Sequence, residues 1–545
     1  MRRHKRYATG LLAAVLVMAS CSGDGDDATD PTSGRIDRPA TTSAAAATTA
    51  APSQTTAASS QPIAGGDPSA VGDASEDRST REVTATTTAP ATATFEDYGA
   101  NPFEDPLEDE FSTFAVDVDT GSYTLMRAWI NEGFLPDPDS VRVEEYVNYF
   151  EGGYTAPEGS TFAVYADGGP TPFWDTRNDI LRIGIKAREV PERRRQDLNL
   201  TLVVDVSGSM SDQGKLEMVQ DALDVLIAEL DRFDTVAIVA YNTSAEVVLE
   251  PTRVSDSDEI LDAIRSLSAG GSTNAEAGLM LGYDLADESF DRDAVNRVVL
   301  LSDGVANVGN TGPDEILERI GEATRKGIDL VTIGVGISTY NDVLLEQLAD
   351  QGDGWYAYID TVGEAERLFQ DQLTTSLETV ARDVKVQVEF DPDYVVEYRL
   401  VGFENRDLQD DDFRDDEVDA GDINAGHSVT ALYDVALTRD AYRSDDAFAT
   451  VRLRWTDADS GRVEEIEGDV RTNLLVDQFE DASPEFQLVS SVAAYAEVLR
   501  DSRWVRGLHL DEVLDEVESL PWRQLDDEAA EEFMGLVEEA VRLDR

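Results

Sequence analysis

The stretch from Leu202 to Asp212 reads LVVDVSGSMSD. Apolar residues lead into Asp205, and Ser207 and Ser209 follow at alternate positions. Alternate side chains of an extended strand share one face, so we expect the carboxylate and both hydroxyls to lie together as the strand turns into its loop. Such a group of oxygen donors suits a divalent cation. A nucleophilic serine, a phosphate-binding loop and an ordinary turn are the alternatives.

Apolar strands alternate with helical patterns from residue 196 to residue 380. This alternation predicts an α/β domain of Rossmann type, a mostly parallel sheet with helices on both faces. The carboxyl ends of parallel strands form the binding edge of such a sheet. Besides Asp205, this edge receives Asp303 after a later strand and Thr273 from the loop AGGSTNAEAG. The strand patterns span residues 198–205, 234–242, 296–303, 328–336 and 355–359.

The residues present argue against the alternative chemistries. A nucleophilic serine needs a base, and the three histidines, His4, His427 and His509, all lie outside the α/β segment. Leu216 after Lys215 breaks the phosphate-loop pattern. The sequence DTGS at residues 119–122 occurs once, whereas an aspartic protease needs two copies, so we expect a turn into a helix capped by Thr120 or Ser122. We therefore expect no enzymatic activity.

The pattern D-x-S-x-S, a threonine in a glycine-rich loop and an aspartate after a later strand resemble the metal-ion-dependent adhesion site of von Willebrand factor type A domains. The resemblance implies that Ser207, Ser209 and Thr273 bind the metal directly, and that Asp205 and Asp303 bind it directly or through water. The ion would be Mg²⁺, or else Mn²⁺ or Ca²⁺. The implied partner is a protein that supplies an acidic residue to an open coordination position.

The resemblance extends past this domain. From about Phe95 onward the folded chain resembles the YfbK-type family of exported bacterial proteins, in segments such as FSTFAVDVDTGSYTLMRAWINEGF and YNDVLLEQLADQGDGWYAYIDT. The expected domains are an N-terminal family-specific region at 95–195, the type A domain at 196–380, a β-rich domain at 381–480 and a helical region at 481–545. Strand patterns on both sides of the type A domain suggest that it is inserted between two parts of one β-rich domain.

The N-terminus indicates export. Residues 1–21 combine a basic start, a short apolar run and the sequence ASC, which resembles a lipoprotein signal peptide with Cys21 as the lipidated residue. Residues 22–94 are rich in Ala, Thr, Ser and Pro and predict a disordered tether. We therefore expect a protein anchored to the outer face of the cell membrane, which contacts the membrane through its lipid alone.

Charge narrows the class of partner. The 545 residues include 111 acidic and 44 basic ones, a formal net charge of −67. Nucleic-acid binding requires clustered Lys and Arg, so nucleic acid is excluded as a partner. The leading hypothesis is an envelope-tethered binding or adhesion module that acts through its metal. The alternative is an envelope scaffold or assembly factor whose metal site is structural or vestigial.

Overall fold

The computed structural model describes residues 97–545 except 175–177, 191–194, 305–312, 337–341, 370–377, 417, 419, 459 and 526, together with Phe95 and the two-residue strand β1 (Val15–Leu16). Cys21 and the expected tether lie outside the described residues. Within the described part of the chain, none of the helices has the length and apolar character required to cross a bilayer.

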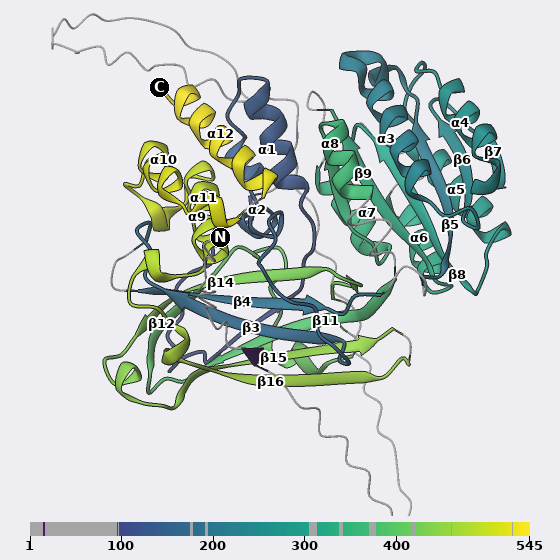
Figure 1. Cartoon of the computed structure of the whole chain (residues 1–545). Helices are drawn as coiled ribbons and strands as arrows, with labels where there is room; N and C mark the ends of the chain where they lie inside the picture. The colour runs from purple at the N-terminus through teal and green to yellow at the C-terminus, as the bar shows by residue number, and fades with distance from the viewer. Residues whose placement is uncertain are drawn as a thin grey trace, which may run out of the picture. The chain divides into compact units, whose positions relative to one another are not determined.

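The central α/β segment forms a six-stranded sheet (Figure 1). Neighbouring strands are parallel, except that β7 runs antiparallel to β6. Chain order reverses at β5, because β6 lies on one side of it and β8 on the other. Ligands of open α/β sheets bind at the carboxyl ends beside such a reversal. The spatial order is β10 (Tyr356–Ile359), β9 (Ile328–Val335), β8 (Ala294–Ser302), β5 (Asp197–Asp205), β6 (Thr235–Tyr241) and β7 (Ala245–Arg253).

Helices cover both faces of this sheet, as the apolar runs predict. Alternate residues of β5 enter two different cores: Leu202 packs in one and Val203 in the other. The first core contains α3 (Lys215–Glu229), α4 (Ser257–Ser266) and α8 (Val362–Arg367). The second contains α5 (Ala275–Glu288), α6 (Pro313–Thr324) and α7 (Asp342–Gln351).

The edge strand β7 is absent from the sequence-based expectation, which has five strands. Its residues are exposed or partly buried, except that Leu249 is buried. Pro251 lies within it, and proline is confined to edge strands because it lacks an amide donor. The sequence of β7 therefore has few apolar residues because the strand lies at the edge of the sheet.

Flanking segments form two antiparallel sheets that enclose a common apolar core. The first has the order β1, β3 (Phe162–Gly169), β4 (Asp179–Ala187), β14 (Ser428–Leu437) and β12 (Val395–Val401). The second has the order β13 (Ile423–Asn424), β11 (Thr379–Phe390), β15 (Ala447–Asp457) and β16 (Val463–Arg471), and β2 (Phe111–Ala115) also pairs with β11. Each sheet thus combines strands from before and after the α/β segment, which is the arrangement that an insertion produces.

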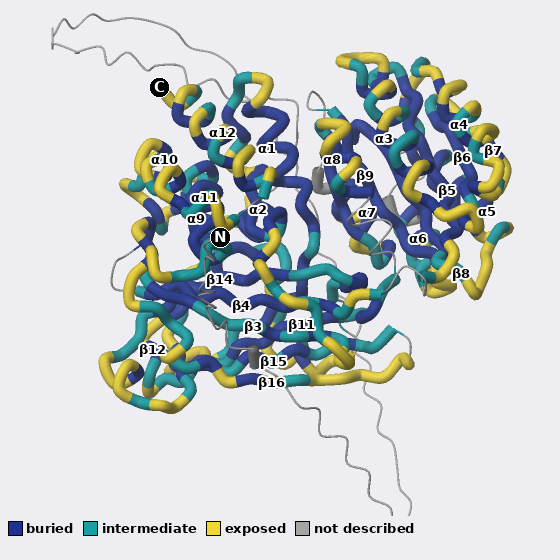
Figure 2. Tube along the Cα trace, viewed as in Figure 1, coloured by how far each residue is buried: buried dark blue, intermediate teal, exposed yellow. Residues whose placement is uncertain are grey.

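The N-terminal and C-terminal helices share one core on the other face of the first sheet. On β4, Ile180 points to these helices whereas Leu181 points into the core between the sheets. Figure 2 shows β4 and the inner sides of these helices as mostly buried. The helices are α1 (Gly121–Asn131), α2 (Val143–Asn148), α9 (Pro484–Leu499), α10 (Leu510–Ser519), α11 (Trp522–Leu525) and α12 (Glu528–Leu543).

Helix α1 also packs on the α/β sheet. Its Trp129 belongs to the core of α5, α6 and α7. At Gly121, a Cβ atom would lie 2.1 Å from a ring carbon of Tyr356 in β10, so only glycine allows this approach. The Tyr356 amide donates to Asp119 Oδ1 at 2.9 Å. The DTGS sequence therefore contacts the edge strand β10 and connects α1 to the α/β sheet.

The expected side-chain cap of α1 is wrong. Thr120 is the N-cap residue, but its side chain makes no capping hydrogen bond. The Ser122 hydroxyl donates to the Ser140 carbonyl at 2.6 Å. The Ser122 amide instead donates to Glu145 Oε2 at 2.7 Å. A carboxylate from α2, distant in sequence, thus replaces the local cap.

Candidate metal centre at the carboxyl edge of the parallel sheet

The first loop of the site continues β5. The Asp205 side chain is fully buried, and its Oδ1 accepts a hydrogen bond from the Ser207 amide at 2.8 Å. The Ser207 and Ser209 hydroxyl oxygens lie 3.0 Å apart. The short helix η3 (Gly208–Gly214) follows and delays the start of α3 until Lys215. The alternate residues thus stay together after the strand has ended, as the spacing predicts.

The second loop carries Thr273, and two backbone hydrogen bonds fix it to the first. The Gly270 amide donates to the Val206 carbonyl at 2.8 Å, and the Gly208 amide donates to the Gly271 carbonyl at 3.1 Å. Thr273 is buried, and the next residue, Asn274, caps α5 through its side chain. These bonds bring Thr273 to the loop that carries the two serines.

The third loop follows β8 and carries Asp303, which is also fully buried. The preceding Ser302 hydroxyl donates to Asp205 Oδ2 at 3.1 Å, and the Tyr241 hydroxyl donates to the same oxygen at 3.3 Å. Asp205 is therefore oriented by groups from the loop after β5, from β6 and from β8. The structure places all five predicted residues on three loops at one edge of the sheet.

Electrostatics at this edge favour an added cation. Burial raises the pKa of Asp205 to about 6; hydrogen bonds from Ser207 oppose this rise, and the negative charge of Asp303 adds to it. A divalent cation would remove the repulsion between the two carboxylates. Among the described residues, no three His, Cys, Asp or Glu side chains are grouped as metal ligands. Such a group is not required, because the predicted donor set has two carboxylates and three hydroxyls.

Lys215 is a site residue that the sequence reasoning missed. Its Nζ lies 2.9 Å from Asp303 Oδ2, and both side chains are buried. Gly336 makes room for its stem, since a Cβ atom there would lie 2.4 Å from Lys215 Cε. The only sequence signal for it is its position directly after the serine loop, where a lysine fits a phosphate-loop pattern as readily as a metal site. Ser302 and Tyr241 were also missed, because they look like ordinary ends of buried strands.

Comparisons with known families agree with this organisation. Residues 199–372 match the von Willebrand factor type A domain, and residues 375–543 match the family described as the C-terminal part of the uncharacterized protein YfbK. Residues 89–182 match a family described as von Willebrand factor. A von Willebrand factor type A structure from Catenulispora acidiphila is 17% identical, covers 68% of this chain and 88% of that chain, and has a TM-score of 0.39.

Individual relatives extend the similarity. The human inter-alpha-trypsin inhibitor heavy chain H4 is 29% identical over 207 residues, which are 35% of this chain and 21% of that protein. The uncharacterized protein sll0103 of Synechocystis is 34% identical over 190 residues, 35% of this chain and 44% of that protein. The uncharacterized protein YfbK of Escherichia coli is 35% identical over 437 residues, 77% of this chain and 76% of that protein. The chain therefore belongs to the YfbK family and carries a von Willebrand factor type A domain.

Proposed function

We propose that this protein binds a divalent cation, Mg²⁺ in the first place, at the carboxyl edge of its type A domain, and there binds an acidic residue of a partner protein. The observation that carries the proposal is the convergence of three loops on two buried carboxylates and neighbouring hydroxyls. Hydroxyl and carboxylate oxygens are the donors that Mg²⁺ prefers.

The proposed ligands are of two kinds, charged carboxylates and neutral hydroxyl groups. Asp205 and Asp303 would supply the negative charge that holds the ion, and Ser207, Ser209 and Thr273 would supply neutral oxygens. The bound ion would supply positive charge to attract a carboxylate, which is the group that a protein ligand presents. Nothing in this arrangement requires a chemical step, so the proposed activity is binding and not catalysis.

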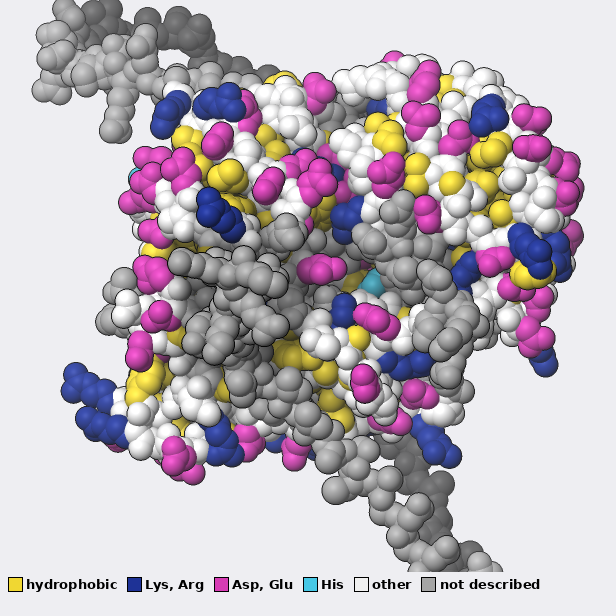
Figure 3. Space-filling model, viewed as in Figure 1, with side chains coloured by type: hydrophobic (Ala, Val, Ile, Leu, Met, Phe, Trp, Pro, Cys, Tyr) yellow, Lys and Arg dark blue, Asp and Glu magenta, His cyan; other side chains and the backbone are white. Residues whose placement is uncertain are grey.

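The proposed setting is the cell envelope. Lipidation at Cys21 and the Ala/Thr-rich residues 22–94 would hold the folded part at the outer face of the membrane. In Figure 3 acidic side chains spread over the described surface of the visible face, with fewer basic ones among them. Such a surface favours solubility and disfavours direct contact with an anionic membrane.

A second function is favoured by one contact, the ion pair of Lys215 and Asp303. The ammonium group already compensates one of the two carboxylates, so the edge of the sheet could fold without added metal. In this alternative the protein is a scaffold or assembly factor of the envelope, and its contacts lie on the flanking sheets and helices. Partner binding would then be independent of Mg²⁺.

The test is a titration of the purified protein with Mg²⁺, followed by capture of membrane proteins in the presence of Mg²⁺ or EDTA. We expect Asp205→Ala to lose both Mg²⁺ binding and partner capture. Asp212→Asn is the matched control, because Asp212 is an exposed carboxylate of the same loop outside the donor set. Capture that survives both EDTA and Asp205→Ala would reject the adhesion proposal and support the scaffold.

A further inference from the structure

We infer that the partner protein presents a basic side chain beside its acidic residue, and that this side chain enters a cavity next to the metal centre. The inference rests on the function proposed above and adds a second contact with the same partner. The cavity has a volume of about 240 Å³. Pockets for small molecules span roughly 300–1,000 Å³, so this space fits one long side chain better than a separate ligand.

The cavity continues the carboxyl edge of the parallel sheet, where ligands of such sheets bind. Val335 at the end of β9 and Ile359 at the end of β10 line it, together with Met218 of α3. Lys215 also lines it, and the Nζ of this lysine contacts Asp303 Oδ2 at 2.9 Å. One lysine side chain therefore separates the cavity from the metal centre, and a segment bound at the metal would have a neighbouring side chain beside the cavity.

The N-terminal region supplies another wall of the cavity. Ala128, Asn131 and Glu132 line it from the end of α1. Helix α1 reaches this edge because Gly121 allows it to approach Tyr356 of β10 closely. A type A domain alone would lack this wall, so the cavity depends on the way the N-terminal region packs against the domain.

Charge at the end of α1 favours a basic side chain. The carboxyl end of a helix carries a partial negative charge, which a nearby cation stabilises. The last turn of α1 contains no basic residue, and Glu132 at its C-cap adds a full negative charge. The Glu132 side chain is exposed and forms no hydrogen bond or ion pair with another described residue. The negative end of this helix is therefore available to a cation from outside.

The other charged residues of the lining are already paired. The Asp360 carboxylate lies 2.6 Å from Arg127, and the Lys215 ammonium group is held by Asp303. Among the described lining residues, Lys215 is the only cation. Glu132 thus leaves one uncompensated negative charge at the cavity, which is the complement of one lysine or arginine.

The remaining lining suits the stem of such a side chain. Met218 is partly buried, and its flexible thioether adapts to the shape of an alkyl chain. Lysine and arginine bury their stems against apolar groups while the charged head stays near water. Gln213 is exposed at the same cavity with φ of +54°, a backbone conformation that non-glycine residues adopt mainly at functional sites.

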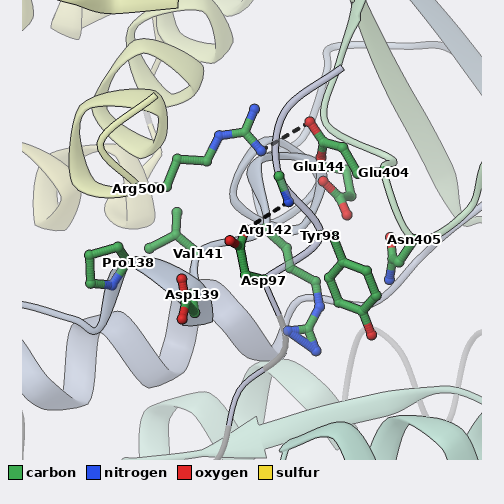
Figure 4. A pocket seen from close by; sticks show the side chains of 11 residues that line it. Asp97, Tyr98, Pro138, Asp139, Val141, Arg142, Glu144, Glu404, Asn405 and Arg500 are labelled. Atoms are coloured by element: carbon green, nitrogen blue, oxygen red, sulfur yellow. Dashed lines mark hydrogen bonds and ion pairs between the residues drawn. The ribbon is translucent and has the colours of Figure 1, made fainter. Parts of the chain in front are cut away.

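A second cavity, beside α2, shows the contrast (Figure 4). Carboxylates line it too, among them Glu144 and Glu404. Two guanidinium groups, those of Arg142 and Arg500, also line it, and Arg500 pairs with Glu404 at 3.1 Å. Cations of the chain itself already face those carboxylates, so we assign no ligand to that cavity.

The experiment measures the binding of blocked pentapeptides to the purified chain by saturation-transfer NMR, in Mg²⁺ and in EDTA at constant ionic strength. Each peptide has a central aspartate with one lysine, norleucine or glutamate on either side and alanine at its ends. A lysine peptide with asparagine in place of the aspartate measures attraction to the acidic surface as a whole. In Mg²⁺ we expect the lysine peptide to bind about fivefold tighter than the norleucine peptide, the scale of one ion pair, and the glutamate peptide to bind most weakly.

Variants at exposed positions locate the preference. Glu132→Gln should reduce the preference for lysine to about twofold or less, because the end of the helix dipole alone remains. Glu132→Lys should reverse the preference in favour of glutamate. Both variants should keep the Mg²⁺ affinity of the native protein. The matched control is Glu259→Gln, at an exposed glutamate of α4, which should leave the preference unchanged.

The outcomes separate this inference from the function on which it rests. Equal Mg²⁺-dependent binding of the three aspartate peptides would overturn the inference and leave metal-mediated binding intact. A preference for lysine that survives Glu132→Gln would overturn it as well, because the preference would arise elsewhere on the surface. Peptide binding that is the same in EDTA, or after Asp205→Ala, would reject the proposed function and the inference together.

Discussion

Asp205 of the α/β sheet and Glu497 of helix α9 are both fully buried, yet their surroundings oppose each other. Burial raises the pKa of Asp205 to about 6, and its neighbours are hydroxyl groups and another carboxylate. Burial also acts on Glu497, but Arg500 and Arg399 outweigh it and lower its pKa to about 2. A buried carboxylate that carries its own counter-charges is structural, whereas one that lacks them has room for a cation from solution.

The largest expected effect is at Glu497. Its Oε1 lies 2.7 Å from Arg500 and 3.2 Å from Arg399, so Glu497→Gln would remove the carboxylate that these two buried guanidinium groups share. Among the ion pairs of the described residues, Arg500 would keep only its pair with Glu404, and Arg399 only the longer contact of 4.0 Å with Asp434. We expect the free energy of unfolding to fall by about 3–5 kcal/mol. Urea denaturation measures this change, with Glu538→Gln, at an exposed position of α12, as a control expected within about 0.5 kcal/mol. If the free energy of unfolding fell by less than about 1 kcal/mol, Glu497 would not stabilise the fold through these ion pairs.

The same residue makes a prediction about pH. Because the folded-state pKa of Glu497 lies below its usual value of 4.5, the stability it contributes is present above about pH 4.5 and is lost as the pH falls toward 2. The stability gap between the native protein and Glu497→Gln should therefore stay constant from pH 8 to pH 5. It should close by about 3 kcal/mol toward pH 2, from 1.36 kcal/mol per pKa unit. A gap independent of acid would contradict the ion pairing.

Asp205 should behave in the opposite way. In EDTA, Asp205→Asn removes an uncompensated buried charge, so we expect stability to rise by about 1–2 kcal/mol. In Mg²⁺ at a hundred times its dissociation constant, the native protein should gain about 2.7 kcal/mol and the variant nothing. Thermal and urea unfolding in both buffers measure these changes. An Asp205→Asn protein that is less stable in EDTA would mean that the carboxylate is structural.

The smallest effect is expected at Lys215. Its ammonium group balances the charge of Asp303, much as the two arginines balance the charge of Glu497. Lys215→Met removes the ammonium group beside Asp303 and should strengthen Mg²⁺ binding by about tenfold, or about 1.4 kcal/mol. Lys326→Met, at an exposed ion pair with Asp287, should leave the affinity unchanged. Weaker Mg²⁺ binding in Lys215→Met would instead show that the ammonium holds Asp303 in its binding position.

Much of the α/β part could be predicted from local sequence. The five expected strands form and are parallel to one another, because each apolar run is buried on both faces. Strand β7 was missed, because at an edge half of its side chains remain outside the core. The cap of α1 was predicted wrongly, because Glu145 comes from another helix and local sequence contains no sign of it.

By itself, the sequence determined which oxygen donors meet. Asp205, Ser207 and Ser209 are close along the chain, and parallel strands bring their carboxyl ends to one edge, so Asp303 follows from topology. Tertiary structure alone decided the charges around buried carboxylates. The Lys215 ammonium group contacts Asp303, and the guanidinium groups of Arg399 and Arg500 contact Glu497. At Glu144, by contrast, burial and then the negative charges of Glu404 and Asp117 raise the pKa to about 7. Long side chains cross between elements, so their partners depend on packing and not on local sequence.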